Sequence, residues 1–162
     1  MSVERSGFGT SEIRDYRERD FTDIVALDRE CFEPGIAYSE GEMRRFLALT
    51  TRVALVAHEE TGLAGFCIGY RSPPRTARIL TLDVRASNRR TGLGRRLLQQ
   101  TVDRMVAAGA TETALEVDVR NQSAIRFYEG LRFQRVGRLE DYYGPGRDAF
   151  EMLRRERPDS GP

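Results

Sequence analysis

A turn that contains glycine, placed between an apolar strand and a long amphipathic helix, constrains this chain more than any other feature. Residues 79–84 (ILTLDV) have the composition of a buried strand, and a polar segment leads from them to Gly92-Leu-Gly94. Glycines at such a junction let the backbone approach a ligand, and the free amides of the first helical turn favour an anion. Apolar residues at helical spacing then predict a helix that ends at Gly109, with an apolar face of Leu93, Leu97, Leu98, Val102, Met105 and Val106.

Four arginines, Arg89, Arg90, Arg95 and Arg96, surround this turn. Each lies near the positive end of the helix dipole, where a cation costs roughly 0.3–1 kcal/mol. A bound polyphosphate would reverse the sign of that contribution, whereas the alternative interpretation is a turn with a solvated arginine face. Other nucleotide motifs fit less well, because the chain has no Lys for a Walker loop and has Leu97 where a dinucleotide fingerprint needs its third glycine.

The rest of the chain alternates short strands and helices. Asp20 is expected to cap a helix that Pro34-Gly35 ends, and Ser39 with Glu42 forms a capping box for a second helix. The pattern predicts strands over residues 13–16, 53–57, 63–70, 78–84, 113–119, 133–136 and 149–153, with a short helix over 121–131.

Composition indicates one globular domain. The chain has 162 residues, 26 of them basic and 25 acidic, with 40% apolar residues, so no nucleic-acid partner is expected. No stretch approaches the ~20 apolar residues of a membrane span, so no membrane is expected either. Cys31 and Cys67 have apolar neighbours, which predicts two buried thiols in a reducing compartment, the cytoplasm, and no metal site. Residues 157–162 are expected to be a disordered tail.

Three segments resemble the GNAT superfamily of N-acetyltransferases. Arg89-Arg-Thr-Gly-Leu-Gly94 matches the Q/R-x-x-G-x-G/A acetyl-CoA loop of that family. Residues 115–133 resemble the L-E-V-x-x-x-N-x-x-A-I-x-x-Y-x-x-x-G-F segment of the RimI-type N-terminal acetyltransferases, with Arg132 at the glycine position. Residues 141–152 are similar to the Y-Y-x-x-G-x-D-A-x-x-M ending of the same group.

This resemblance covers residues 13–152 and implies a fold. The fold is of the α/β (α+β) class, with a mixed, mostly antiparallel sheet of six to seven strands flanked by about four helices. A single acetyltransferase domain would occupy residues 1–156.

The resemblance also implies that acetyl-CoA is the acyl donor. The loop amides would hold its pyrophosphate, and the strand before the loop would pair with its pantetheine arm. Asn121 would cap its helix and also contact the coenzyme. The complete set implied for the coenzyme is Leu82, Asp83, Val84, Arg89, Arg90, Thr91, Gly92, Leu93, Gly94, Arg95 and Asn121.

Glu116 and Tyr128 are the catalytic residues that the resemblance implies. Acyl transfer from a thioester to an amine needs a neutral amine and a proton for the departing thiolate. Tyr128 would donate that proton, and Glu116, twelve residues earlier, would act as the base through water or with a raised pKa. The alternatives are a core aromatic for Tyr128, a solvated carboxylate for Glu116, and Asp118 as a competing base. His58 is expected to be structural or exposed.

The sequence alone does not decide which amine accepts the acetyl group. Tyr142 and Tyr143 resemble the paired tyrosines that enclose an amino-terminal backbone in the RimI group, which implies the α-amine of a protein or peptide and direct transfer in a ternary complex. Tyr38 lies in a loop, residues 32–39, that helps to shape the acceptor pocket in the family and departs here from the F-P-W-S of bacterial RimI. A small-molecule amine (polyamine, antibiotic or amino acid) and a non-catalytic acyl-CoA-binding module are the alternatives. The protein is expected to be a monomer or a weak homodimer.

Overall fold

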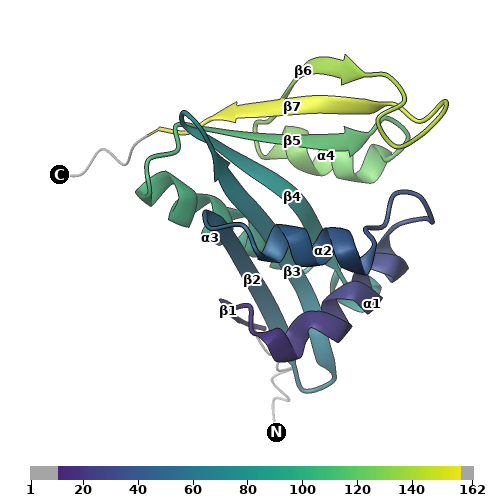
Figure 1. The fold of residues 1–162 in the computed structure, drawn as a ribbon, viewed down its shortest axis with the longest axis vertical. Coiled ribbons are helices and arrows are strands. Elements are labelled where there is room, and N and C mark those ends of the chain that lie inside the picture. Colours follow the sequence, from purple (N-terminus) through teal and green to yellow (C-terminus); the bar gives the residue numbers. More distant parts are fainter. Residues whose placement is uncertain (1–10, 158–162) are drawn as a thin grey trace, which may run out of the picture.

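A computed structural model describes residues 11–157, which form one mixed seven-stranded sheet and four α-helices. The strand order is β1-β2-β3-β4-β5-β7-β6, and among these neighbours only β4 and β5 run parallel (Figure 1). The fold expected from the sequence is therefore confirmed. The strands are β1 (Glu12–Asp15), β2 (Arg52–Glu59), β3 (Gly62–Ser72), β4 (Thr76–Val84), β5 (Glu112–Asp118), β6 (Gln134–Leu139) and β7 (Ala149–Arg155).

The helices cover both faces of the sheet, so the chain has two apolar cores. Helices α1 (Phe21–Cys31) and α2 (Glu40–Leu47) pack on one face, against residues of β2 and β3. Helices α3 (Leu93–Ala107) and α4 (Gln122–Gly130) share the core of the opposite face with residues of β2 to β5. Short 3-10 helices, η1 (Glu18–Asp20) and η2 (Ala86–Asn88), precede α1 and α3. None of the helices in residues 11–157 is long and apolar enough to cross a membrane.

Strands β4 and β5 are paired along only part of their length. These strands pair over Thr76–Arg78 of β4 and Glu112–Ala114 of β5, and then diverge, as Figure 1 shows. On its other side β4 has a bulge at Leu80, because consecutive residues of β3 oppose Ile79 and Thr81. The second half of β4 therefore has a strand partner on one side only.

Two of the three expected N-caps are confirmed. The Ser39 hydroxyl accepts the Glu42 N–H at 3.2 Å, and the Asn121 Oδ1 accepts the Ala124 N–H at 3.1 Å. Asp20 occupies the N-cap position of α1, but its side chain accepts no hydrogen bond from the first turn of that helix, so the expected side-chain cap is absent. The Asp20 carboxylate instead accepts the N–H of Arg17, at 2.8 Å, at the start of η1.

At two further positions, Cys31 and Arg132, the structure adds to or corrects what the sequence predicts. Cys67 is fully buried as expected, but Cys31 is only half-buried and borders the cleft described below, so the expectation for Cys31 was wrong. Arg132 has φ +70°, so the turn after α4 has an arginine in the left-handed conformation that favours glycine. Of the expected disordered tail, residues 158–162 lie outside the described residues.

Candidate active site

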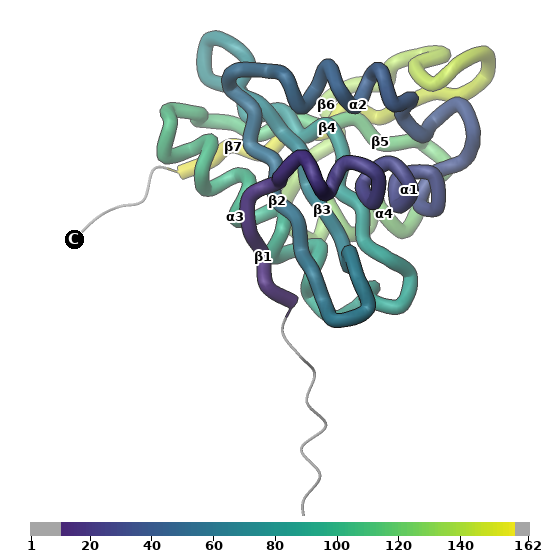
Figure 2. Tube along the Cα trace, turned by 60° about the horizontal axis from the view of Figure 1, so that its bottom comes forward, coloured from purple at the N-terminus to yellow at the C-terminus, as the bar shows by residue number. Residues whose placement is uncertain are grey.

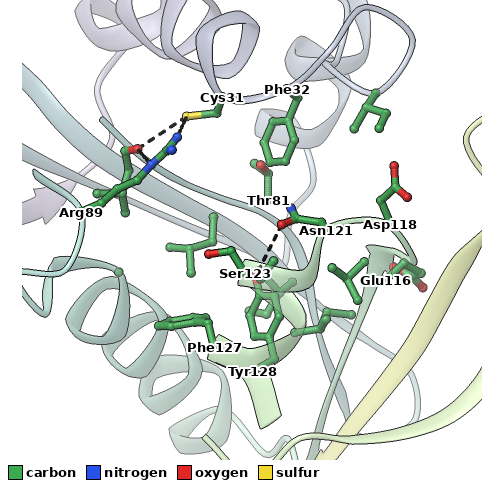
Figure 3. A pocket seen from close by; sticks show the side chains of 18 of the residues that line it. Cys31, Phe32, Thr81, Arg89, Glu116, Asp118, Asn121, Ser123, Phe127 and Tyr128 are labelled. Atoms are coloured by element: carbon green, nitrogen blue, oxygen red, sulfur yellow. Dashed lines mark hydrogen bonds between the residues drawn. The ribbon is translucent and has the colours of Figure 1, made fainter. Parts of the chain in front are cut away.

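The divergence of β4 and β5 opens a cleft of about 1140 Å³. Its walls come from β4, β5, the start of α3, α4, and two connections, α1–α2 (residues 32–39) and β6–β7 (residues 140–148). Figure 3 shows Arg89 and Cys31 at one end and Glu116 and Asp118 at the other, with Tyr128 between them. The cleft therefore joins the glycine turn to the residues expected to be catalytic.

At the first end, the main chain before α3 has an unusual conformation. Arg90 and Gly92 have φ values of 60° and 86°, in the left-handed region. A Cβ atom built on Gly92 would meet nothing within 4 Å, so this position favours glycine for its conformation rather than for lack of space. The amides of Leu93, Gly94 and Arg95 have no carbonyl one turn earlier to bind, as at the start of any α-helix. The turn thus offers free N–H groups to an anion.

Arginine side chains add positive charge to the same end. Arg89, Arg90 and Arg95 line the cleft, and the Arg89 Nε donates to the Val84 carbonyl at 3.1 Å. Arg96 points elsewhere, since its guanidinium donates to the Ser11 carbonyl at 3.2 Å. The cluster of four arginines expected around the anion is therefore a cluster of three.

The side chains expected to contact the coenzyme do not all face the cleft. Leu82 and Val84 line it, together with Gly92, Gly94 and Asn121. Asp83 does not, and its side chain is buried with only 1% exposed. Thr91 and Leu93 are also absent from the lining; Thr91 is exposed outside the cleft, and the Leu93 side chain is buried in the core.

Glu116 projects into the cleft from β5, with 14% of its side chain exposed. Burial raises the pKa of this carboxyl, and an ion pair with Arg78 of β4 opposes that effect without cancelling it. The pair forms where β4 and β5 are still hydrogen-bonded, with Arg78 opposite Ala114. Glu116 is therefore a carboxylate of increased basicity rather than a solvated one.

Tyr128 reaches the cleft from α4. Its ring packs edge-on against Phe127 and Phe133, with ring centroids 5.2 and 5.7 Å apart. Burial raises the pKa of the phenol above its usual value, so the hydroxyl keeps its proton at neutral pH. Tyr128 is both a core aromatic and a cleft residue, so its position is compatible with both interpretations of the sequence.

Asp118, the competing carboxylate, differs from Glu116 in its surroundings. Burial raises its pKa, but hydrogen bonds from the main chain and side chain of Arg120 and from Arg147 bring the pKa below the usual value. A carboxylate bound in this way is a weaker base than Glu116.

Aromatic and charged side chains line the second end of the cleft. Tyr38 and Tyr143 lie in its lining, whereas Tyr142 does not and is 48% exposed. The Arg147 guanidinium lies 2.9 Å from a Glu33 carboxylate oxygen and 3.4 Å from an Asp118 oxygen. This contact joins the α1–α2 and β6–β7 connections, which run near each other in Figures 1 and 2. Neither Arg78 nor Arg147 was found from the sequence, because each is recognised only by its tertiary partner.

Within residues 11–157 no group of three or more His, Cys, Asp or Glu side chains is suited to hold a metal ion. His58 lies outside the cleft, with Nε2 3.2 Å from an Asp20 carboxylate oxygen.

A sheet that opens beside a turn with free amides, with the Glu116 carboxyl and the Tyr128 hydroxyl in the opening, has the arrangement expected for an acyltransferase. Residues 20–133 match the model of the acetyltransferase (GNAT) family, and the chain belongs to that family. It is 32% identical to N-alpha-acetyltransferase 30 of Schizosaccharomyces pombe over 143 residues, which are 85% of this chain and cover 93% of that protein. For the human protein of the same name the match spans 78 residues, at 37% identity, and only 22% of its length.

Two further comparisons agree with this family. The chain is 38% identical to N-alpha-acetyltransferase RimI of Mycobacterium tuberculosis over 94 residues, 57% of this chain and 58% of that protein. A chain in the structure of the NatC complex bound to Gag peptide and CoA has the same fold, with a TM-score of 0.78 and 25% identity. That match covers 91% of this chain and 99% of the other. The resemblance to RimI-type acetyltransferases is thereby confirmed.

Proposed function

We propose that this chain transfers the acetyl group of acetyl-CoA to the N-terminal α-amine of a protein or peptide, directly and within a ternary complex. One observation carries the proposal: Glu116 of β5 and Tyr128 of α4 line the same cleft where β4 and β5 separate. The acceptor class is supported by the relatives, which are named as N-alpha-acetyltransferases.

The end of the cleft near α3 fits acetyl-CoA, which supplies the acetyl group as a thioester. The free amides at the start of α3, with Arg89, Arg90 and Arg95, would bind its pyrophosphate. The main chain of residues 82–84 lacks a strand partner on the cleft side and would pair with the pantetheine arm. Asn121 borders the same space. A structure of the same fold, at 25% identity, is described as bound to CoA, which supports this assignment.

Tyr128 and Glu116 would move the two protons of the reaction. Tyr128 holds its proton at neutral pH, because burial raises its pKa, and would donate that proton to the thiolate as it departs. Glu116 would accept the amine proton, directly or through water, because burial makes it a stronger base and Arg78 still favours its ionised form.

An α-amine suits this base better than a lysine side chain does. The α-amine has a pKa of about 7.7–8.0, so roughly a tenth to a sixth of it is neutral at pH 7, whereas a lysine amine, with a pKa of about 10.4, is almost entirely protonated. We assign the acceptor backbone to the space beside Tyr38 and Tyr143, with Tyr142 at its rim.

A matched pair of peptides tests the proposal. One peptide has a free amino terminus and no lysine, and the other is blocked at its amino terminus and has one lysine. We expect faster acetylation of the free amino terminus by the wild-type protein, and loss of that activity in Tyr128→Phe. Faster turnover of the blocked lysine peptide would contradict the proposal. If neither peptide is acetylated but a small amine is, the acceptor is a small molecule instead.

The active form is proposed to be a monomer or weak homodimer in the cytoplasm. Cys31 and Cys67 are free thiols, which is compatible with a reducing compartment. Sedimentation at assay concentration, together with activity against concentration, would test the assembly state.

A further inference from the structure

Asp28 and Asp83 form a buried pair of carboxyl groups that the proposed chemistry does not use. Asp28 belongs to α1 and is 0% exposed, and Asp83 belongs to β4 and is 1% exposed. The two carboxyl groups lie close together across the interface between helix and sheet, and each changes the pKa of the other. Such burial is rare for Asp unless the group is paired.

The hydrogen bonds around the pair leave one oxygen of each carboxyl without a donor. The Asp28 Oδ2 accepts the Tyr38 N–H at 2.7 Å, and the Asp83 Oδ1 accepts the Thr81 hydroxyl. The Asp28 Oδ1 and the Asp83 Oδ2 are buried and contact no N–H or O–H group. Two ionised carboxylates in contact at a dry site repel each other strongly, whereas one shared proton satisfies both oxygens.

The pair connects the two walls that border the second end of the cleft. Through Asp28 it fixes the main chain of Tyr38, whose hydroxyl donates to the carbonyl of Leu80, the bulged residue of β4, at 3.2 Å. Through Asp83 it fixes β4 between Leu82 and Val84, which both line the cleft. The position of Tyr38 relative to the second half of β4 therefore depends on contacts that meet at this pair.

We infer that Asp28 and Asp83 are positioning residues for acetyl transfer, and that the proton they share holds Tyr38 and the wall formed by β4 in their working arrangement. The inference rests on the proposed function, since it takes Tyr38 as part of the acceptor site. Loss of the proton places two negative charges in contact, so it separates α1 from β4 and displaces Tyr38.

The surroundings of the pair decide the direction of its pH dependence. Burial raises the pKa of both carboxyls, and that of Asp83 lies well above its usual range. Arg89 lowers the pKa of Asp83, while Arg29 lowers and Glu42 raises that of Asp28. The titratable groups on the other packed elements keep their protons at neutral pH, because burial raises their pKa values: Cys31, Tyr38, Cys67 and Tyr128.

A raised pKa means that the folded state keeps a proton that the unfolded chain has lost. The contribution of the pair to stability is complete below the ordinary Asp pKa and is lost as pH rises through the raised value. Activity that depends on the pair is lost on the same side, at alkaline pH.

Three substitutions test the inference. Asp83→Asn and Asp28→Asn replace the shared proton by an amide N–H that cannot ionise, and Asp83→Ala removes the link. Asp103→Asn makes the same change at an exposed position of α3 and serves as the control. The measurements are kcat and KM for the free-terminus peptide against pH, and the free energy of unfolding against pH.

We expect Asp83→Asn to keep kcat/KM within about threefold of wild type at pH 7 and to lose part of the alkaline decline. The pH slope of its unfolding free energy should be smaller than that of wild type, by an amount that corresponds to at most one bound proton. Asp83→Ala should raise the peptide KM about tenfold or more while the affinity for coenzyme A changes less, and Asp103→Asn should change nothing.

If the unfolding free energy has the same pH slope in wild type and Asp83→Asn, the inference that the two carboxyls share a proton is wrong. An infrared carbonyl band of a protonated carboxylic acid at neutral pH, present in wild type and lost in both Asn variants, gives the same answer without turnover. If the slopes differ but wild type acetylates no peptide, the proposed function fails and the pair is only a structural link. Unequal slopes with an unchanged peptide KM in Asp83→Ala would also overturn the positioning role.

Discussion

The two ends of the cleft are built from different parts of the chain. The end near α3 consists largely of main chain, namely the left-handed residues Arg90 and Gly92 and the free amides after them. The other end consists of side chains from separate segments, among them Tyr38, Glu116 and Arg147. A main-chain site is specified by a few consecutive residues, whereas a side-chain site is specified by the tertiary arrangement. Substitutions at the two ends should therefore differ in what they change.

The largest effect is expected at Tyr128, where the two ends meet. Tyr128→Phe removes only the hydroxyl, so kcat should fall about 10²-fold or more, the usual scale for a general acid. The affinity for coenzyme A should stay close to that of wild type, because the ring contacts with Phe127 and Phe133 remain. Steady-state kinetics with calorimetry of coenzyme A measures both quantities. An unchanged kcat would make Tyr128 a core residue only.

The next effect tests the main-chain end alone. Gly94→Asp places a carboxylate beside the turn and should weaken coenzyme A binding about 10-fold to 100-fold, equivalent to about 1.4–2.7 kcal/mol. Asp in the first turn of a helix is itself stabilising, so unfolding would not explain the loss.

Gly94→Ala is the control for that change. Its Cβ would lie 3.4 Å from a Val84 methyl carbon and 3.8 Å from Phe127, which are ordinary contacts. Calorimetry should find coenzyme A binding little changed in this variant. Equal binding by wild type and Gly94→Asp would place the anion elsewhere.

A third change tests the side-chain end alone. Arg147→Gln breaks the contacts with Glu33 and Asp118, so the peptide KM should rise severalfold, roughly 3-fold to 10-fold, with coenzyme A affinity unchanged. Glu33→Gln should have a smaller effect, because the Glu33 side chain is largely exposed and Arg147 keeps Asp118. If only the affinity for coenzyme A changed, the assignment of donor and acceptor to the two ends of the cleft would be wrong.

A fourth change shifts a pH profile rather than removing activity. A base must be ionised to act, so kcat/KM should rise with pH through the pKa of Glu116. Arg78 lowers that pKa against the larger effect of burial, and Arg78→Gln should move the acid limb of the profile to higher pH. A shift to lower pH, or none, would show that another group is the base.

The smallest effect lies outside both ends. Arg132 is exposed and has φ +70°, so Arg132→Gly relieves backbone strain and should raise the free energy of unfolding by up to about 1 kcal/mol. Urea unfolding measures the gain. Kinetic constants for both substrates should stay unchanged. A change in either would show that the turn after α4 contributes to one end of the cleft.

The same contrast explains how much was predictable from the sequence. The turn at residues 89–94, the capping box at Ser39 and the helix cap at Asn121 follow from local residues, and all were found. The ion pair of Arg78 with Glu116 was not found, because it depends on the register of β4 with β5.

Side-chain direction was the other source of error. Asp83 was expected to serve the coenzyme from within an apolar strand, but its carboxyl turns toward α1 and meets Asp28. Arg96 lies one residue beyond the last arginine that faces the cleft, so the helix directs it to Ser11 instead. Neither partner is near in sequence, and no local pattern indicates such a contact.

The short junction between β4 and β5 has an evolutionary consequence. Only three residue pairs join β4 to β5, so the backbone couples the two parts of the sheet over a short stretch. Substitutions in separate, non-contacting regions usually have additive effects. A lineage could therefore change the proposed acceptor site by small mutational steps at Tyr143 or Arg147 while its use of the donor stays constant, whereas a change at Tyr38 also reaches β4 through Leu80.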